Sequence, residues 1–216
     1  MPTLLSLQIG RPHRHPRPAF APPGHYWQTA FFKYPVAGPV ALGRFNVAGD
    51  RQADQRVHGG PDQAVLAYAA DHYPLWRAEL GLPDMGPGGF GENFTVAGQS
   101  EADVCIGDVY QLGDAIVQVS QPRGPCYKIS WRWNRPDLLA RVEATGRHGW
   151  YLRVLQEGTV QAGLDLVRLA RPNPSWTLSR ARDVIRNRKR GPAAVLELAA
   201  VAELSEAHRR LLLSVR

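Results

Sequence analysis

The stretch "QLGDAIVQVSQPRGPCYKI", residues 111–129, carries the strongest fold signal in the chain. The run "AIVQVS" is rich in β-branched residues and is typical of a buried strand. Gly113-Asp114 before it can supply the positive φ of a tight hairpin turn. Prolines on either side of Gly124 restrict the backbone that follows. The stretch therefore predicts a hairpin that leads into a stiff turn bearing Cys126.

Other strand-like runs fill the first 172 residues. They are bounded by turn residues and are not separated by regular helices, which favours a barrel or sandwich over a doubly wound sheet. Segments 69–81 and 135–146 have helical patterns that end at a glycine. The expected fold class is mainly β with α, that is α+β. The further strand-like runs are "TLLSLQI", "PVALGRF", "ENFTV", "DVYQL", "WYLRVL" and "LDLVRLA".

The composition changes after "RPNPSW", where glycine becomes rare and Ala, Leu, Arg and Glu dominate. Three segments then have helical apolar spacing, and Thr177 and Ser205 stand where N-cap residues would be needed. We therefore predict a β-rich domain over residues 1–172 and a small three-helix domain over residues 173–216.

The overall composition is that of a globular protein. Hydrophobic residues make up 44% of the 216 positions, and two cysteines are too few for a disulfide framework. No signal-peptide pattern and no membrane-spanning run is found, so we expect a cytoplasmic protein. The net charge of +7 and the run "RNRKR" at 186–190 leave a nucleic-acid or protein-binding module as an alternative. Because the other basic residues are scattered, we do not expect nucleic acid as the ligand.

Cys126 is the first candidate for chemistry. Arg123 and Lys128 would lower the pKa of its thiol if they face it, and a thiolate is a nucleophile and a metal ligand. The alternative is that Cys126 packs as a small hydrophobic residue. Cys105 fits that alternative better, since Val104 and Ile106 flank it.

Loop histidine and glycine clusters supply further candidates. His58 precedes Gly59-Gly60-Pro61, whose backbone can approach a ligand closely. Asp62 is expected to cap a helix or turn over residues 64–68. His58 or His148 could pair with Cys126 for thiol hydrolysis. The alternative for His58 is a structural or merely exposed histidine.

The glycine-rich segment 86–96 contains Gly91, Glu92 and Asn93. Its amides could hold an anion, and its two polar side chains could cap a turn or hydrogen-bond a heterocycle. Arg147 follows a helix between glycines, in a position suited to anion contact or to a solvated turn. No HExxH, CxxC, GxSxG or dinucleotide-binding motif occurs.

Together and in this order, five segments resemble the MOSC family, named for the C-terminal domain of molybdenum cofactor sulfurases. The likeness is to the bacterial branch linked to resistance to hydroxylaminopurine. It covers most of the first 170 residues, and the tail looks like the three-helix domain of that branch. The segments are 24–42, 49–76, 88–98, 106–129 and 146–158.

The resemblance implies a Greek-key β-barrel in which Cys126 ligates the molybdenum of a molybdopterin cofactor. It also implies reduction of N-hydroxylated purines or amines to the parent amine, a detoxification. Because the chain has no flavin, haem or iron–sulfur motif, a separate electron-donating reductase would be needed. The alternative within the family is a sulfur-carrier or cofactor-handling protein that uses a Cys126 persulfide.

The remaining site predictions follow from this likeness. His58, Glu92 and Asn93 would orient substrate or cofactor or deliver a proton. A family association with pyridoxal phosphate exists, but "FFKYP" around Lys33 supports it only thinly, so we do not expect that cofactor. A homodimer is left open. The residues expected to bind cofactor are Arg123, Arg147, Gly91, Lys33 and Lys128.

Overall fold

The computed structural model describes residues 1–54 and 58–214. Its strands are β1 (Thr3–Ile9), β2 (His13–Pro16), β3 (Tyr26–Thr29), β4 (Tyr34–Pro35), β5 (Val40–Leu42), β6 (Val65–Ala69), β7 (Phe94–Ala97), β8 (Val109–Leu112), β9 (Ala115–Pro122), β10 (Trp150–Gln156), β11 (Gly158–Val160) and β12 (Val167–Ala170). Its helices are α1 (His72–Leu80), α2 (Lys128–Arg132), α3 (Leu138–Thr145), α4 (Leu178–Arg186), α5 (Pro192–Ala199), α6 (Glu206–Leu213) and the short 3-10 helix η1 (Pro61–Gln63).

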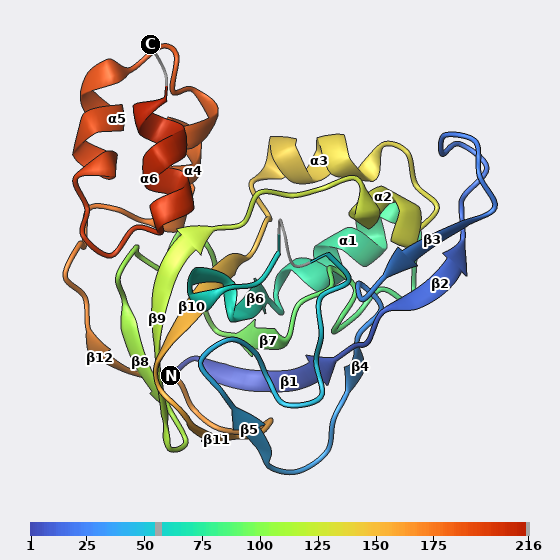
Figure 1. The fold of residues 1–216 in the computed structure, drawn as a ribbon, viewed down its shortest axis with the longest axis horizontal. Helices are drawn as coiled ribbons and strands as arrows, with labels where there is room; N and C mark the ends of the chain where they lie inside the picture. Colours follow the sequence, from blue (N-terminus) through green and yellow to red (C-terminus); the bar gives the residue numbers. More distant parts are fainter. Residues whose placement is uncertain (55–57, 215–216) are drawn as a thin grey trace.

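The centre of the fold is a curved sheet in the order β12-β8-β9-β10-β6-β7-β1-β4 (Figure 1). The β6–β7 pair is parallel and its other pairs are antiparallel. The start of β1 also bonds to the segment just before β12, since the amide of Leu4 donates to the carbonyl of Leu164 at 2.9 Å. The sheet therefore curls into a half-barrel, which confirms the expected α+β class.

The β8–β9 hairpin forms as the sequence predicts. Leu112 pairs with Ala115 across a two-residue turn in which Gly113 has a φ of 58°. β9 bonds to β8 on one side and β10 on the other, and Val117 and Val119 are fully buried. This strand therefore lies between β8 and β10 inside the sheet, and it leads into the loop that carries Cys126.

The expectation of a helix or turn over residues 64–68 was wrong. Residues Val65–Ala69 form strand β6, and each of its five residues is buried. A strand that is covered on both faces needs no alternation of polar and apolar residues, so its sequence does not show the usual period of two. Asp62 precedes it in η1 and forms an ion pair with Arg153 at 2.9 Å.

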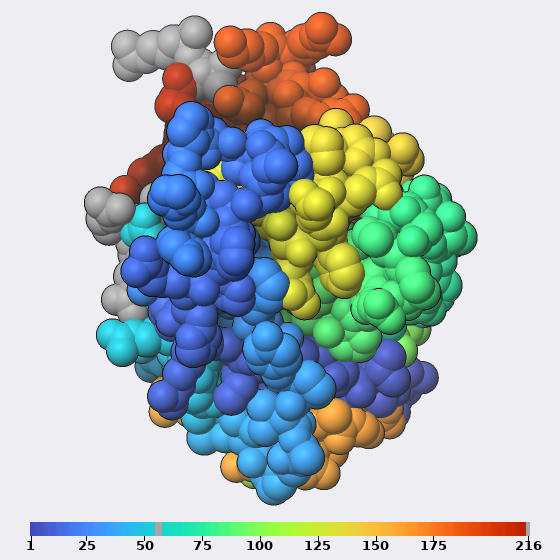
Figure 2. Space-filling view, turned by 90° about the vertical axis from the view of Figure 1, so that its right-hand side faces the viewer, coloured from blue at the N-terminus to red at the C-terminus, as the bar shows by residue number. Residues whose placement is uncertain are grey.

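A second hairpin, β2–β3, projects from one corner of the molecule and was not predicted (Figure 1). Figure 2 shows this blue segment beside the yellow segment that contains α2 and α3. Trp27 of β3 contacts Trp131 of α2 edge-to-face, with ring centroids 5.2 Å apart. The contact fixes the hairpin against the helix that follows Cys126.

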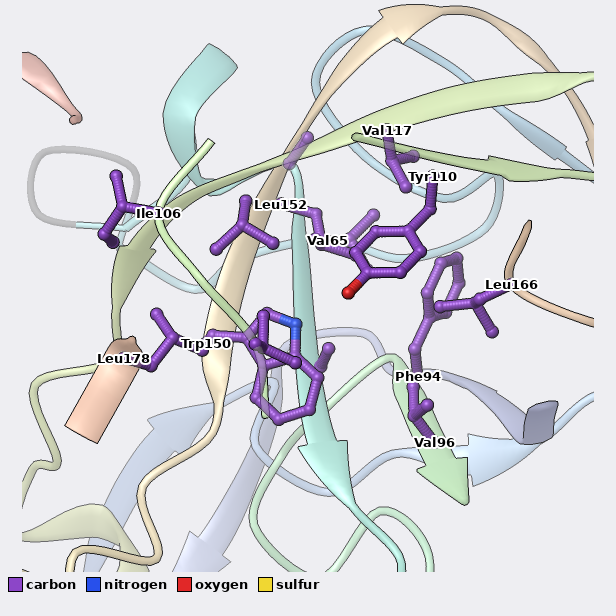
Figure 3. Packing of buried hydrophobic residues seen from close by; sticks show 14 of the residues in the cluster. Val65, Phe94, Val96, Ile106, Tyr110, Val117, Trp150, Leu152, Leu166 and Leu178 are labelled. Carbon is purple, nitrogen blue, oxygen red and sulfur yellow. The ribbon is translucent and has the colours of Figure 1, made fainter. Parts of the chain in front are cut away.

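The hydrophobic core lies inside the curved sheet (Figure 3). Tyr110, Phe94 and Trp150 come from three different strands and are almost fully buried. A smaller cluster lies under α1 and α3, where the rings of Tyr68 and Phe90 stack with centroids 4.3 Å apart. Phe90 belongs to the glycine-rich segment 86–96, so this second cluster packs against that segment.

The three C-terminal helices stand at the corner opposite the β2–β3 hairpin (Figure 1). Their predicted N-caps are confirmed, because the hydroxyls of Thr177 and Ser205 accept bonds from amides three residues on. Leu178 and Leu198 belong to the same buried cluster as the sheet residues, so the helices share the main core. The division at residue 172 stays a prediction. Within the described residues, no helix has the length and apolar character needed to cross a membrane.

Candidate functional site

Cys126 lies in the loop between β9 and α2. The amide of Arg123 donates to the carbonyl of Gly149 at 3.0 Å, which extends the strand pairing by one residue beyond Pro122. The carbonyl of Cys126 then accepts from the amide of Ile129 at 3.2 Å as the chain turns into α2. The thiol is half-buried and forms no disulfide. The stiff turn predicted from the prolines is thus held at both ends by backbone bonds.

A cavity opens beside this loop. It holds about 630 Å³ of space, part of it open to solvent, which lies within the range of small-ligand pockets. Its lining includes seven of the predicted site residues, from segments far apart in the sequence. They are Lys33, His58, Gly91, Asn93, Arg123, Cys126 and Lys128.

Arg123 is a buried cation in the lining of the cavity. The residue is only 4% exposed, and its Nη1 atom has no hydrogen-bond partner in the part of the chain that the structure describes. Its guanidinium lies 5.8 Å from the ring centre of Phe31. A buried guanidinium with an unsatisfied nitrogen is costly unless an anion pairs with it. Arg123 therefore marks the cavity as a site for an anionic ligand.

Lys33 forms a buried ion pair with Asp50. Burial lowers the pKa of the Lys33 ammonium, and the Asp50 carboxylate opposes that shift. Asp50 also accepts from the amide of Gly10 at 2.7 Å, so its position is fixed. The pair is close to neutral, which leaves Arg51, Arg123 and Lys128 as the cavity's cations without an ion-pair partner among the described residues.

His58 faces these cations. Burial lowers the pKa of its imidazole, the positive charges of Lys128 and Arg123 lower it further, and Asp54 acts in the opposite direction. The imidazole is therefore neutral at pH 7. An anion bound beside Arg123 would raise the pKa of His58 and make it a better proton carrier.

Gly91 and Asn93 form the cavity wall. Gly91 has a φ of 74°, and a Cβ there would lie 2.9 Å from the ring of Phe31. The side-chain amide of Asn93 accepts from the amide of Leu66 at 3.3 Å and donates to the carbonyl of Gln8 at 3.2 Å. Asn93 thus holds the wall in place through bonds to two neighbouring segments.

Glu92 does not line the cavity. Its carboxylate is fully buried and accepts from the hydroxyls of Tyr73 and Thr95 and from the amides of Gly88 and Phe90. These four donors occupy the carboxylate and shape the glycine-rich loop around it. The carboxylate of Glu92 therefore holds the glycine-rich loop together and does not face the cavity.

Arg147 also lies elsewhere. Its guanidinium pairs with Glu79 at 2.8 Å and covers the ring of Trp76 at 4.7 Å, both on α1. Arg147 therefore contacts α1 and does not line the cavity. Cys105, by contrast, is buried as predicted, and its S–H points to the carbonyl of Pro174 at 3.5 Å.

Several lining residues were not predicted. Asp50 and Arg51 lie on a loop, and Thr29 is the last residue of β3 in the unpredicted hairpin. A charged residue that pairs with a partner 17 positions away leaves no local pattern, so the Lys33–Asp50 pair could not be found from spacing. The other unpredicted lining residues are Ala30, Phe31, Gln52, Ala53, Gln63, Leu66 and Tyr151.

The cavity offers the Cys126 thiol as a candidate metal ligand, but the described part of the chain forms no metal-binding cluster there. Among the described residues, no three His, Cys, Asp or Glu side chains converge on one point. A metal held here would have to bring most of its ligands with it and take one from Cys126. A soft thiolate suits a transition metal of that kind.

Comparison with known proteins identifies the family. The model of the MOSC domain matches residues 54–167, which include His58, Asn93, Arg123 and Cys126. The chain belongs to the MOSC family. The protein YflK of Bacillus subtilis (strain 168), whose function is uncharacterised, is 40% identical over 207 residues, covering 96% of this MOSC chain and 91% of YflK.

Two further relatives extend the comparison. A Gibberella moniliformis protein named "Reductase" is 42% identical over 163 residues, which are 74% of this chain but only 29% of that protein. YiiM of Escherichia coli (strain K12) is 37% identical over 147 residues, 66% of this chain and 65% of YiiM. The structure of YiiM from Geobacillus stearothermophilus matches with a TM-score of 0.82 and 33% identity, covering 99% of this chain and 98% of that one. The whole chain, including its helical tail, thus has the fold of YiiM.

Proposed function

We propose that this MOSC protein binds the molybdenum cofactor in the Cys126 cavity and reduces N-hydroxylated purines or amines to the parent amine. The observation that carries the proposal is that one cavity is lined both by the half-buried thiol of Cys126 and by the buried Arg123, whose Nη1 atom is unsatisfied within the described residues. The cofactor is an anionic dithiolene that carries a phosphate, so it needs one soft protein ligand and several cations. The cavity offers both.

The residues present fit that group. Cys126 would be the protein ligand to the metal, and Arg123 and Lys128 would pair with the anionic parts of the cofactor. The lack of a cluster of three or more metal-ligating side chains in the described part of the chain agrees with a metal whose other ligands come from the cofactor. The two free cysteines agree with a reducing compartment, and we place the protein in the cytoplasm.

The proposed reaction converts R–NH–OH, two electrons and two protons into R–NH2 and water. When bound, the cofactor supplies two-electron redox chemistry at molybdenum. His58 lines the cavity as a neutral base that can take up a proton and give it to the leaving oxygen. Gly91 and Asn93 line the cavity, and the bonds of Asn93 to Leu66 and Gln8 hold that part of its wall in place. Each residue thus serves binding, proton transfer or positioning.

The electrons would come from a separate reductase. The Gibberella protein named "Reductase" supports this, because the region similar to this chain is only 29% of its length. A longer chain can carry the electron-donating part that this one would take from a partner.

Product formation tests the proposal. Protein purified from a host that makes the cofactor is incubated with a chemical reductant and 6-hydroxylaminopurine, and adenine is measured by chromatography. We expect turnover by wild type and by Cys105→Ser, and loss of turnover in Cys126→Ser. Full turnover by molybdenum-free protein would overturn the mechanism. A persulfide on Cys126 without any reductase activity would favour the sulfur-carrier alternative.

A further inference from the structure

A second depression adjoins the cavity and shares part of its wall. The two have Arg51, Gln52, Ala53 and Lys128 in common, so one leads into the other. We call this depression the basic groove. Its lining is Arg11, Pro12, His13, Gln28, Arg51, Gln52, Ala53, Asp54, Tyr127 and Lys128.

The basic groove carries excess positive charge. The first acidic residue of the chain is Asp50, so the whole segment that forms the β2–β3 hairpin contains no Asp or Glu. Arg51 and Lys128 form no ion pair with any described residue, and Arg11 bonds only through Nε to the carbonyl of Gly49 at 3.4 Å. Asp54 is the acidic residue in this lining, and its charge acts on His58. Even with Lys128 assigned to the cofactor, Arg11 and Arg51 outnumber this one carboxylate, which favours an anionic ligand.

The groove also has an aromatic wall beside the thiol. Tyr127 directly follows Cys126 and is 50% exposed. Its ring packs on Trp131 with centroids 4.7 Å apart, and Trp131 packs in turn on Trp27. The Tyr127 ring is therefore held in position while much of its surface stays accessible. An exposed, fixed aromatic ring is a stacking surface for a heterocyclic base.

The combination of these features matches one kind of molecule. Tyr127 and Arg11 both line the groove and not the cavity, and Tyr127 directly follows the cavity residue Cys126 in the chain. A nucleotide has the two matching parts, a flat base and a phosphate. We propose that the basic groove binds the phosphate of an N-hydroxylated nucleoside monophosphate, whose base lies against Tyr127 at the cavity mouth. The inference rests on the proposed function and narrows its substrate from free bases to nucleotides.

Two measurements test the inference. The first compares kcat/KM for the ribonucleoside of 6-hydroxylaminopurine and for its 5′-monophosphate, with a chemical reductant and at low salt. We expect the monophosphate to be preferred about tenfold, because each phosphate–arginine bond is charge-assisted, and the preference to shrink as salt rises. Arg11→Gln should narrow the ratio between the two substrates severalfold. Arg44→Gln, an exposed arginine of the same acid-free segment outside the groove, should leave the ratio as it is.

The second measurement does not need turnover. Quenching of tryptophan fluorescence compares binding of adenosine and of adenosine 5′-monophosphate to wild type and Arg11→Gln. Tighter binding of the monophosphate that is lost in Arg11→Gln supports the groove, even if no reduction of either substrate is found and the proposed function fails. Equal affinity and equal kcat/KM for the two forms would overturn the inference. Loss of bound molybdenum in Arg11→Gln would also overturn it, since the groove would then serve the cofactor.

Discussion

At the scale of single residues, local sequence predicted that Cys126 and Arg123 would belong to one site. It did not predict which other residues line that site. Cys126 and Arg123 are three positions apart on one stiff loop, so both end beside the same cavity. Glu92 and Asn93 are adjacent, yet only Asn93 lines the cavity. Neighbouring residues entering a strand point to opposite sides, and the sequence does not say which side holds the ligand.

The structural role of the Glu92 carboxylate can be tested by substitution. Glu92→Gln replaces one acceptor oxygen with an amide nitrogen that cannot accept the bonds now made, leaving buried donors unsatisfied. We expect the free energy of unfolding to fall by about 2–4 kcal/mol, measured by urea denaturation. Glu79→Gln breaks a partly exposed ion pair with Arg147 and should cost less than about 1 kcal/mol. Equal effects of the two substitutions would show that the Glu92 carboxylate is not a structural centre.

At the scale of elements, turn chemistry was the most predictive feature. Gly113-Asp114 identified the β8–β9 hairpin because a two-residue turn needs positive φ, which is a local property. The β2–β3 hairpin was missed because its connection is a long loop and the sequence of β2, His13–Pro16, is too polar to look like a strand, although the loop contains the turn residues Pro22-Pro23-Gly24. β6 was misread because it is buried on both faces.

The role of Gly113 in the β8–β9 turn can be tested by comparing its substitution with that of Gly163. A Cβ on Gly113 would lie 2.4 Å from the carbonyl oxygen of Thr159, whereas a Cβ on Gly163 would meet nothing within 4 Å. Both glycines have positive φ. We expect Gly113→Ala to lower the free energy of unfolding by at least about 2 kcal/mol more than Gly163→Ala, because only the first adds a clash to the backbone strain. Similar losses in urea denaturation would contradict this account of the turn.

At the scale of the whole molecule, the α+β class and the helical tail were predictable from strand-like runs, from three segments with helical spacing, and from five segments that stand in family order. Sequence could not show that the tail shares the sheet's core. The amide of Leu178 donates to the carbonyl of Val104, and the amide of Ser205 donates to the carbonyl of Ser120. These contacts join segments more than 70 positions apart, and no local pattern encodes them.

This junction predicts a pH dependence of stability. Burial lowers the pKa of His148 from its ordinary 6.5 to about 4, with Arg182 lowering it further and Glu101 and Glu143 opposing. The unfolded chain therefore binds this proton between pH 6.5 and 4 while the folded chain does not. Stability is present above about pH 6.5 and falls as the pH drops toward 4, by at most about 3 kcal/mol.

Unfolding by urea at several pH values measures that slope. His148→Gln removes the titrating group, so we expect its free energy of unfolding to fall less steeply between pH 6.5 and 4 than that of the wild type. His13→Gln, at an exposed position on β2, controls for removal of a histidine. An unchanged slope in His148→Gln would show that other groups cause the acid sensitivity.

Metal content shows whether Cys126 holds molybdenum in its cation-lined cavity. Wild type, Cys126→Ser and Cys105→Ser are purified from a host with intact cofactor synthesis, and molybdenum per chain is measured by mass spectrometry. We expect about one atom for wild type and Cys105→Ser and less than about a tenth of that for Cys126→Ser, since Cys126 is the cysteine that lines the cavity. Equal molybdenum in the two serine variants, or none in the wild type, would overturn the assignment of Cys126 as the metal ligand.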